Sequence, residues 1–337
     1  MVDRIPVRKV STVNVLVTGG AGFIGANLCR ELASRPTVGK VIALDDLSTG
    51  FAANLAGVDA ELIEGSILDP ELLDDIVSRV DAVVHLAARP SVPRSLADPL
   101  ASHNVNANGT VYVLEACRRH RVPVVAASSS SVYGAVPVLP KHEDLPTRPM
   151  SPYAASKLAT ESYVLAYGAS FGLPVLAFRF FNVYGPLQAA GHAYAAVVPA
   201  FIDALLRGTP VRIFGDGLQT RDFTYIGTVV RVLADAVLRK VTCPGPVNLA
   251  FGTRVPVIDL TRQLADIIGS PADIRHEAAR PGDVRHSQAS GGLLRELFPD
   301  VAQVPLEQGL AETVRWFRTL PEYEAAVPAE RLTVEVG

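Results

Sequence analysis

The chain has 337 residues, of which 49% are hydrophobic and 19% are charged, and its formal net charge is −3. This composition is globular, and without a basic block it argues against nucleic-acid and anionic-membrane partners. No apolar run is long enough to span a bilayer, and residues 1–12, expected to be a loose tail, lack the apolar region of a secretory signal. The three cysteines are scattered and the seven histidines form no cluster, so we expect a reduced, cytoplasmic protein without a metal site.

Short β-branched runs alternate with amphipathic stretches through the first half of the chain. Strands are expected over 13–19, 40–46, 60–66, 82–88, 122–130 and 175–181, and helices over 23–34, 70–80, 106–120 and 151–172. Strands that are apolar on both faces and separated by helices predict a parallel sheet covered on both sides, which is an α/β, doubly wound fold of the Rossmann type. After residue 181 the pattern is irregular until a further strand expected over 247–251.

The first expected strand ends in the turn Gly19-Gly20-Ala21-Gly22-Phe23-Ile24-Gly25. Glycines there let the backbone approach a pyrophosphate and let the next helix begin close to the strand. Asp45 and Asp46 follow the second strand, where a carboxylate binds the adenosine ribose hydroxyls and repels a 2′-phosphate. The arrangement predicts a dinucleotide site that takes NAD rather than NADP, with one of the two acids expected to be a solvated turn residue.

A tyrosine and a lysine share one face of the helix expected over 151–172. Ser151 suits its N-cap and Pro152 its first turn. Tyr153 and Lys157 are then i and i+4 on that helix, and an ammonium beside a phenol favours the phenolate, so the pair can exchange a proton with a substrate hydroxyl. Alone, this spacing is more often a surface coincidence, and it gains weight from the dinucleotide turn.

Four motifs carry a resemblance to a known family: T-G-G-A-G-F-I-G at 18–25, H-L-A-A at 85–88, S-S-S-S-V-Y-G at 128–134 and S-P-Y-A-A-S-K at 151–157. They resemble the extended short-chain dehydrogenases/reductases, and within them the NAD-dependent nucleotide-sugar 4-epimerases, from about residue 13 to about residue 317. The resemblance implies Ser129, Tyr153 and Lys157 as the catalytic set. The cofactor positions that it implies are Gly19, Gly22, Phe23, Ile24, Gly25, Asp45, Asp46, Leu86, Ala87, Tyr153 and Lys157. Where the family often has Asp-Ile at the adenine, this chain has Ser66-Ile67.

The same resemblance implies contacts to a UDP-sugar in the second half of the chain. Asn182 matches a phosphate or sugar contact, Arg221 and Arg280 match the grip on the diphosphate, and Asp283 matches a ribose contact. Singly, each arginine would more often be a solvated surface residue. Ser287 matches a gatekeeper beside the sugar 2-substituent, and its small side chain predicts UDP-GlcNAc/UDP-GalNAc as well as UDP-Glc/UDP-Gal as substrates.

The regular first half and the irregular second half of the chain predict its domain organisation. We expect residues 13–180 and about 222–251 to form the NAD-binding domain, and residues 181–221 and 252–320 to form a smaller, discontinuous substrate domain, followed by a tail over 321–337. The family pairs two of its long helices across a two-fold axis, which here predicts a homodimer through residues 106–120 and 151–172. Thr228 is expected to cap a helix where the family often has an acid.

The reaction follows from what is missing beside the catalytic serine. Dehydratases and decarboxylases of the family carry acidic residues directly after it, and this chain has Ser130 and Ser131. A 4-epimerase, which passes through a transient 4-keto sugar, needs no such group. Another nucleotide-sugar enzyme, such as a reductase, a dehydratase variant or a C5 epimerase, and a non-catalytic NAD-binding regulator stay open as alternatives.

Overall fold

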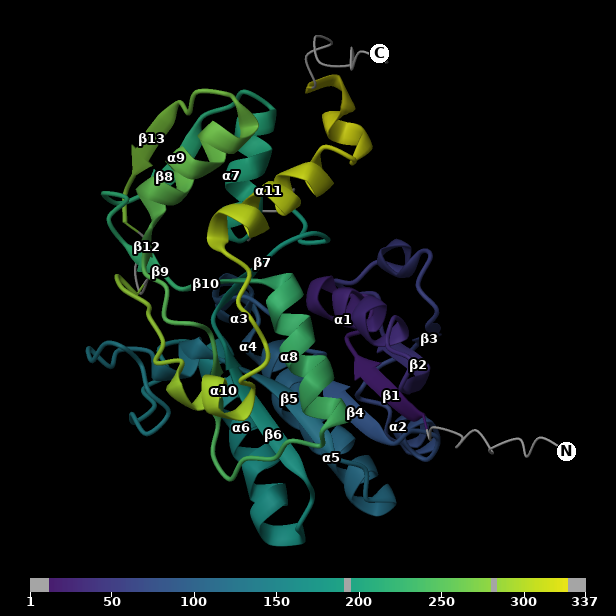
Figure 1. Ribbon diagram of the computed structural model, residues 1–337. Helices are drawn as coiled ribbons and strands as arrows, with labels where there is room; N and C mark the ends of the chain where they lie inside the picture. Colours follow the sequence, from purple (N-terminus) through teal and green to yellow (C-terminus); the bar gives the residue numbers. More distant parts are fainter. Residues whose placement is uncertain (1–11, 191–194, 280–283, 327–337) are drawn as a thin grey trace, which may run out of the picture.

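The computed structural model describes residues 12–190, 195–279 and 284–326. Within them, a seven-stranded parallel sheet has the order β11-β6-β5-β4-β1-β2-β3 (Figure 1). This sheet confirms the predicted doubly wound α/β fold. Its strands are β1 (Val13–Thr18), β2 (Val38–Asp45), β3 (Glu61–Glu64), β4 (Ala82–His85), β5 (Val124–Ser129), β6 (Val175–Phe180) and β11 (Val247–Leu249).

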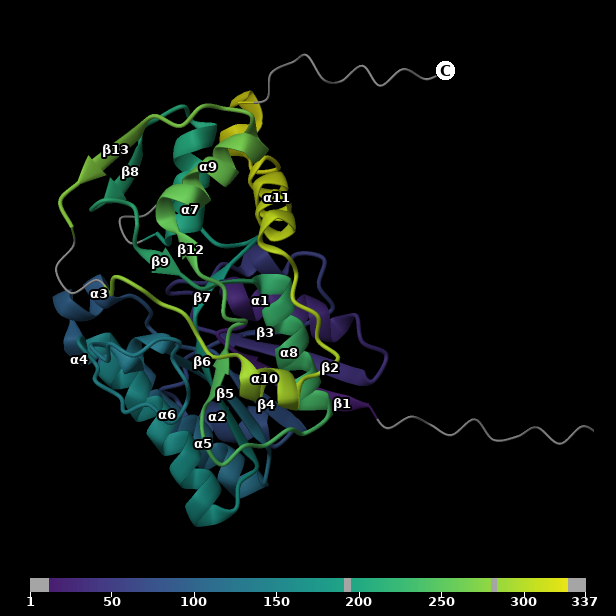
Figure 2. The same ribbon diagram turned by 60° about the vertical axis from the view of Figure 1, so that its left-hand side comes forward.

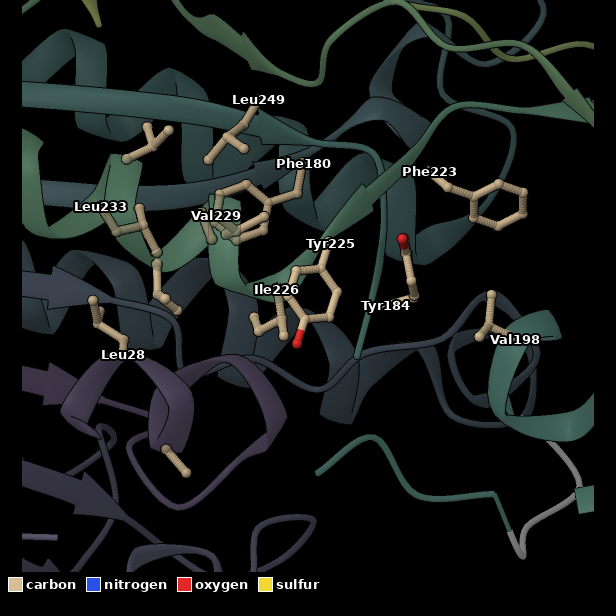
Figure 3. Packing of buried hydrophobic residues seen from close by; sticks show 14 of the residues in the cluster. Leu28, Phe180, Tyr184, Val198, Phe223, Tyr225, Ile226, Val229, Leu233 and Leu249 are labelled. Atoms are coloured by element: carbon tan, nitrogen blue, oxygen red, sulfur yellow. The ribbon is translucent and has the colours of Figure 1, made fainter. Parts of the chain in front are cut away.

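Helices cover both faces of the sheet because alternate strand residues point to opposite sides. Val15 and Val17 of β1 belong to one buried cluster, while Leu16 belongs to another. The first cluster contains α1 (Phe23–Ala33) and α8 (Ile226–Leu238), and Figure 3 shows Leu28 of α1 on the side toward Leu233 of α8. The second cluster contains α2 (Pro70–Val77), α5 (Gly109–His120) and α6 (Pro152–Phe171). The sheet is thus the middle layer of three (Figure 2).

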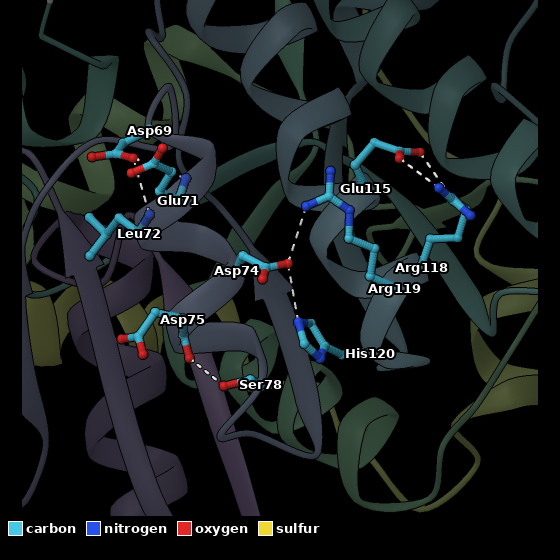
Figure 4. Close-up of polar contacts among 10 residues, drawn as sticks. All are labelled: Asp69, Glu71, Leu72, Asp74, Asp75, Ser78, Glu115, Arg118, Arg119 and His120. Carbon is cyan, nitrogen blue, oxygen red and sulfur yellow. Dashed lines mark hydrogen bonds and ion pairs between the residues drawn. The ribbon is translucent and has the colours of Figure 1, made fainter.

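Surface ion pairs join two of the helices on the second face. Asp74 of α2 accepts hydrogen bonds from Arg119 Nη1 at 3.3 Å and from His120 Nε2 at 3.1 Å at the end of α5 (Figure 4). Asp69 caps the first turn of α2 by accepting from the backbone N–H groups of Glu71 and Leu72. Exposed pairs of this kind contribute about 0–1 kcal/mol each, so the apolar contacts between the helices dominate their packing.

The helix expected over 106–120 has a longer and less regular beginning. It is preceded by α3 (Val92–Ala97), α4 (Pro99–His103) and a π-helical turn over Asn104–Asn108. The buried side chain of Asn106 accepts from Arg89 N at 2.7 Å and donates to Arg89 O at 3.2 Å. These bonds attach the turn after β4 to the helix.

The second half of the chain contains helices that its irregular pattern did not predict. They are α7 (Val197–Leu206), α8, α9 (Val257–Ile268), α10 (Gly292–Leu297) and α11 (Leu306–Phe317). Three pairs of short strands accompany them: β7 (Asn182–Tyr184) with β10 (Phe223–Tyr225), β9 (Thr220–Arg221) with β12 (Val255–Pro256), and β8 (Val211–Phe214) with β13 (Ile274–Glu277). β11 joins the main sheet beside β6, and α8 packs on α1. The predicted domain limits stay a prediction.

Of the two predicted helix caps, one is confirmed and one is wrong. Ser151 caps α6 as predicted, because its Oγ accepts from Ala154 N at 3.1 Å. The prediction for Thr228 is wrong: it lies inside the first turn of α8, fully buried, and its Oγ1 accepts from Val304 N at 3.0 Å.

The predicted C-terminal tail also begins too early. Residues Pro321–Ala326 form a 3₁₀ turn in which Tyr323 is buried against Phe317. Further 3₁₀ turns span Ala52–Leu55 and Ser130–Tyr133. Among the helices of the described ranges, none is long and apolar enough to cross a membrane.

Candidate active site

A cavity of about 540 Å³ lies at the carboxyl ends of the strands of the main sheet. β1 and β4 are neighbours there, although the chain forms β2 and β3 between them, and doubly wound sheets bind their ligands at such a switch point. The cavity brings together every residue predicted for the cofactor and for catalysis. These lining residues are Gly19, Gly22, Phe23, Ile24, Gly25, Asp45, Asp46, Ser66, Ile67, Leu86, Ala87, Ser129, Tyr153 and Lys157.

The glycine turn forms one wall of this cavity at the start of α1. Gly19 has φ +70°, and a Cβ there would lie 2.8 Å from the backbone nitrogen of Ala87. A Cβ on Gly25 would lie 2.0 Å from the carbonyl oxygen of Gly19, so only glycine lets α1 begin this close to β1. No side chain caps the N-terminus of α1, which leaves its first N–H groups available to a phosphate.

The two acids at the end of β2 have different surroundings. Asp45 is buried and lines the cavity, and its carboxylate accepts from Ala21 N and from Leu47 N, both at 2.9 Å. Burial raises the pKa of Asp45, and these backbone hydrogen bonds oppose the rise. Asp46 is exposed and accepts from Ser48 N and Ser48 Oγ within its own turn. Asp45 therefore fits the predicted ribose contact, and Asp46 fits the predicted turn acid.

At the expected adenine position, serine makes one of the contacts that an aspartate could make. Ser66 Oγ accepts from Leu68 N at 3.1 Å, and Ile67 is buried beside Gly109 of α5. The departure from Asp-Ile thus keeps the local turn.

Behind Leu86 and Ala87, a buried histidine fixes the end of β4. His85 Nδ1 lies 2.8 Å from Thr18 Oγ1, and His85 Nε2 lies 3.0 Å from Thr110 Oγ1. Thr18 Oγ1 also accepts from Ala87 N at 3.2 Å. Burial lowers the pKa of His85 to about 3, so it is a neutral link in this chain of hydrogen bonds.

The catalytic candidates meet where β5 ends beside α6. Burial raises the pKa of Tyr153, and a hydrogen bond with the Ser129 hydroxyl opposes the rise. Burial lowers the pKa of Lys157 to about 8, and the Glu161 carboxylate acts in the opposite direction. At pH 7 the site therefore holds a phenol, a hydroxyl and an ammonium. The phenolate expected from the sequence requires a further positive charge near Tyr153.

Three of the residues predicted to contact the substrate, Asn182, Arg221 and Ser287, lie on segments joined by hydrogen bonds and are not in the lining of this cavity. Asn182 donates from Nδ2 to Asp222 O at 3.1 Å, and Ser287 donates from its backbone N–H to Thr220 O at 3.0 Å. Arg221 donates from Nη1 to Thr220 O at 3.0 Å. Arg280 and Asp283 lie outside the described residues.

Asp222, to which we assigned no role from the sequence, holds these segments together. It is fully buried, and its carboxylate accepts from Gly252 N, Thr253 N, Thr253 Oγ1 and Ala289 N at 2.7–3.1 Å. Burial raises the pKa of Asp222, and the four donors oppose the rise. The sequence signal for this role was the position of Asp222 between Arg221 and an apolar strand. Its hydrogen-bond partners could not be predicted because they lie 30–67 residues away.

The lining also contains residues that were not predicted, among them Arg89, Pro90 and Gln188. The buried Oε1 of Gln188 has no hydrogen-bond partner in the described part of the chain. The unpartnered acceptor, the glycine cradle and the buried Asp45 together fit a dinucleotide that has both hydroxyl and amide donors. Across the described ranges, no group of histidine, cysteine and acidic residues could hold a metal ion.

Comparison with known proteins finds relatives that match most of the chain. The profile described as the NAD dependent epimerase/dehydratase family matches residues 15–250. The UDP-glucose 4-epimerase of Mycolicibacterium smegmatis is 38% identical over 319 residues, which cover 91% of this chain and 99% of that protein.

Solved structures with the same fold include epimerases and dehydratases. The UDP-N-acetylglucosamine 4-epimerase of Methanobrevibacter ruminantium, in complex with UDP-N-acetylmuramic acid, is 35% identical, with a TM-score of 0.87 over 92% of this chain and 99% of that one. The dTDP-glucose 4,6-dehydratase of Streptomyces venezuelae, solved with NAD bound, is 33% identical, with a TM-score of 0.84 over 93% of this chain and 100% of that one.

Proposed function

Since the chain belongs to the NAD dependent epimerase/dehydratase family, we propose that it is a UDP-hexose 4-epimerase with NAD as its cofactor. One observation carries the choice of reaction. Ser129, Tyr153 and Lys157 line one cavity, and the acids among its described lining residues are Asp45 and Asp46 at the end of β2. A dehydratase or decarboxylase of the family would use acidic residues directly after the catalytic serine. This chain has Ser130 and Ser131 at those positions.

In this proposal the residues at the end of β5 and on α6 move one proton. Tyr153 takes it from the 4-hydroxyl of the hexose, and Ser129 holds the phenol and the sugar oxygen by hydrogen bonds. Lys157 remains an ammonium and favours the phenolate. When bound, NAD would supply the acceptor for the C4 hydride, the hydride that C4 later regains, and a positively charged ring. After the 4-keto sugar has turned over in the cavity, Tyr153 returns the proton to the oxygen at C4.

The remaining site residues would bind the cofactor and the substrate and orient them toward Tyr153. The glycine turn, Asp45, Ser66-Ile67 and Leu86-Ala87 would hold the dinucleotide. We assign the UDP group to the segments joined by Asp222, which carry Asn182, Arg221 and Ser287, with Arg280 and Asp283 as further proposed contacts. Binding the nucleotide there leaves the hexose as the part that reaches Tyr153.

The proposed reaction is tested by nuclear magnetic resonance of the purified protein with UDP-GlcNAc, and separately with UDP-glucose, without added cofactor. We expect UDP-GalNAc and UDP-galactose to appear, because the cofactor is regenerated within the site. A 4-keto or unsaturated product would instead establish a dehydratase, the second candidate, which the similarity to the Streptomyces enzyme favours. No conversion of either sugar would contradict the proposal.

Substrate range is expected to depend on Ser287. Ser287→Tyr should lower kcat/KM for UDP-GlcNAc by at least about tenfold, because a bulky ring fills the space for the acetamido group, and should leave UDP-glucose within about twofold. Initial rates with both sugars measure the difference. Ser287→Ala is the matched control and should keep both activities. An equal loss of kcat/KM for both sugars in Ser287→Tyr would contradict the gatekeeper role of Ser287.

We further propose a homodimer through α5 and α6. These helices pack with α3 and α4 along one side of the molecule (Figure 2), and each of the four exposes a large apolar side chain. These side chains are Leu96, Leu100, Tyr112 and Tyr163.

The dimer is expected to depend on this apolar face. Tyr112→Glu combined with Tyr163→Glu should convert the dimer to a monomer, because the interface would then bury unpaired charges. Light scattering at micromolar concentration measures the mass. The control Phe51→Glu replaces a more exposed ring after β2 and should leave the dimer intact. A wild-type protein that is already monomeric would contradict the assignment.

A further inference from the structure

A buried ion pair lies directly behind the catalytic candidates. Glu161 is one helical turn after Lys157 on α6, and Arg179 lies on β6. Arg179 donates from Nη2 to Glu161 Oε1 at 2.6 Å and from Nε to Glu161 Oε2 at 2.9 Å. Both side chains are only 4% exposed. A two-pronged, desolvated pair of this kind fixes the carboxylate in one orientation.

A third contact ties this carboxylate to the strand that carries Ser129. Ser128, the residue before it on β5, donates from Oγ to Glu161 Oε2 at 2.8 Å. Since successive strand residues point to opposite sides, Ser128 can face Glu161 while Ser129 faces the cavity. Glu161 therefore joins β5, α6 and β6 behind the cavity.

The pair itself is supported from its far side. Arg179 lies over the ring of Tyr133, 4.6 Å from its centroid, and donates from Nη1 to Glu143 O at 3.2 Å. The Tyr133 hydroxyl donates to Asn248 Oδ1 at 2.7 Å. These neighbours hold the guanidinium of Arg179 in place against the Glu161 carboxylate.

We propose that Glu161 is a positioning residue that provides the fixed negative charge against which Lys157 is kept as an ammonium at the active site. This inference rests on the role proposed above for Lys157. A buried ion pair often adds little to the stability of a protein. The proposed role of Glu161 gives the Glu161–Arg179 pair a function other than stability.

The charged and titratable groups around Lys157 support this assignment. Burial lowers the pKa of Lys157 to about 8, and Glu161 is the group that raises it. His85 of β4 is neutral, because burial lowers its pKa to about 3, and Tyr153 on the same helix is a phenol whose pKa burial raises. Arg179 is held by its two hydrogen bonds to Glu161, and Lys157 and Glu161 are neighbours one turn apart on α6.

The test measures the titration of Lys157 directly and needs no substrate. The chain has five lysines, Lys9, Lys40, Lys141, Lys157 and Lys240, so lysine labelled with ¹³C at Cε gives few signals, and Lys157→Arg assigns the relevant one. In the NAD-bound protein, Glu161→Gln should move the Lys157 midpoint down by about one pH unit. Arg179→Lys keeps the positive charge and should cause a clearly smaller shift.

Either an unchanged midpoint in Glu161→Gln or an equal shift in both variants would overturn the inference. If Glu161→Gln does not fold, the double variant Glu161→Gln/Arg179→Leu, which buries no unpaired charge, carries the same expectation. With UDP-hexose, the alkaline limb of the kcat profile should move to lower pH by the same amount, because activity is lost as pH rises through the pKa of the ammonium. A shifted Lys157 without any epimerisation would refute the proposed function alone.

Discussion

Tyr153→Phe is expected to lower kcat for the epimerisation of UDP-glucose by about 10³-fold, within the range typical for the loss of a general acid–base group. The change removes only the phenol oxygen, which shares a hydrogen bond with Ser129, and keeps the ring. Cofactor content should stay at the wild-type level, because the glycine turn and Asp45 are untouched. Initial rates by nuclear magnetic resonance and acid-released NAD measure the two quantities.

The matched control lies on the same helix. Tyr163 lies on the proposed dimer face of α6 and is not among the residues that line the cavity, and Tyr163→Phe is expected to keep kcat within about twofold, because it retains the ring that the interface would bury. A wild-type rate in Tyr153→Phe would exclude the tyrosine as the proton-transfer group. Equal losses in the two variants would point to damage of α6 instead.

Gly25→Ala should produce the largest change in cofactor retention. The added methyl group would lie 2.0 Å from Gly19 O, so α1 must move away from β1 and the turn must open. Overpacking of this kind costs about 1–3 kcal/mol or more, which predicts about a tenfold or larger fall in NAD affinity together with a lower Tm. Acid release of the cofactor from the purified protein and a thermal scan measure both effects, and the released cofactor should be NAD rather than NADP.

Gly245→Ala is the control for this substitution. A Cβ at Gly245 meets no atom within 4 Å, and its φ is not in the left-handed region. This variant should retain the wild-type NAD content and Tm. Full NAD content in Gly25→Ala would show that the close contact between α1 and β1 is not needed for binding.

The sequence predicted most of what depends on local patterns. The strands of the main sheet are short apolar runs, and the Ser151-Pro152 start of α6 is specified by neighbouring residues, so both appear where they were expected. The family was predicted correctly as well, because the motifs that identify it each lie within a few consecutive residues.

Features that depend on distant partners were missed or misjudged. Thr228 looked like a cap because only its neighbours in sequence were visible, and its partner is Val304, 76 residues away. α7 lies in a stretch that is almost wholly apolar, so it has no amphipathic stripe to reveal it. The pairing of Glu161 with Arg179 and the four donors of Asp222 likewise join separate elements. Nothing in the spacing of these residues indicates such contacts.

From the buried carboxylate of Asp222 we expect an order in which the chain assembles during synthesis. Burying it before Thr253 and Ala289 arrive would leave a charge without donors, at a cost of several kcal/mol. The strands β1 to β5 come from the first 129 residues and can pair while the ribosome is still translating the rest. The segments that Asp222 joins must wait until residue 289 has left the exit tunnel, so we expect a nascent chain to contain a formed glycine turn before it contains the proposed UDP site.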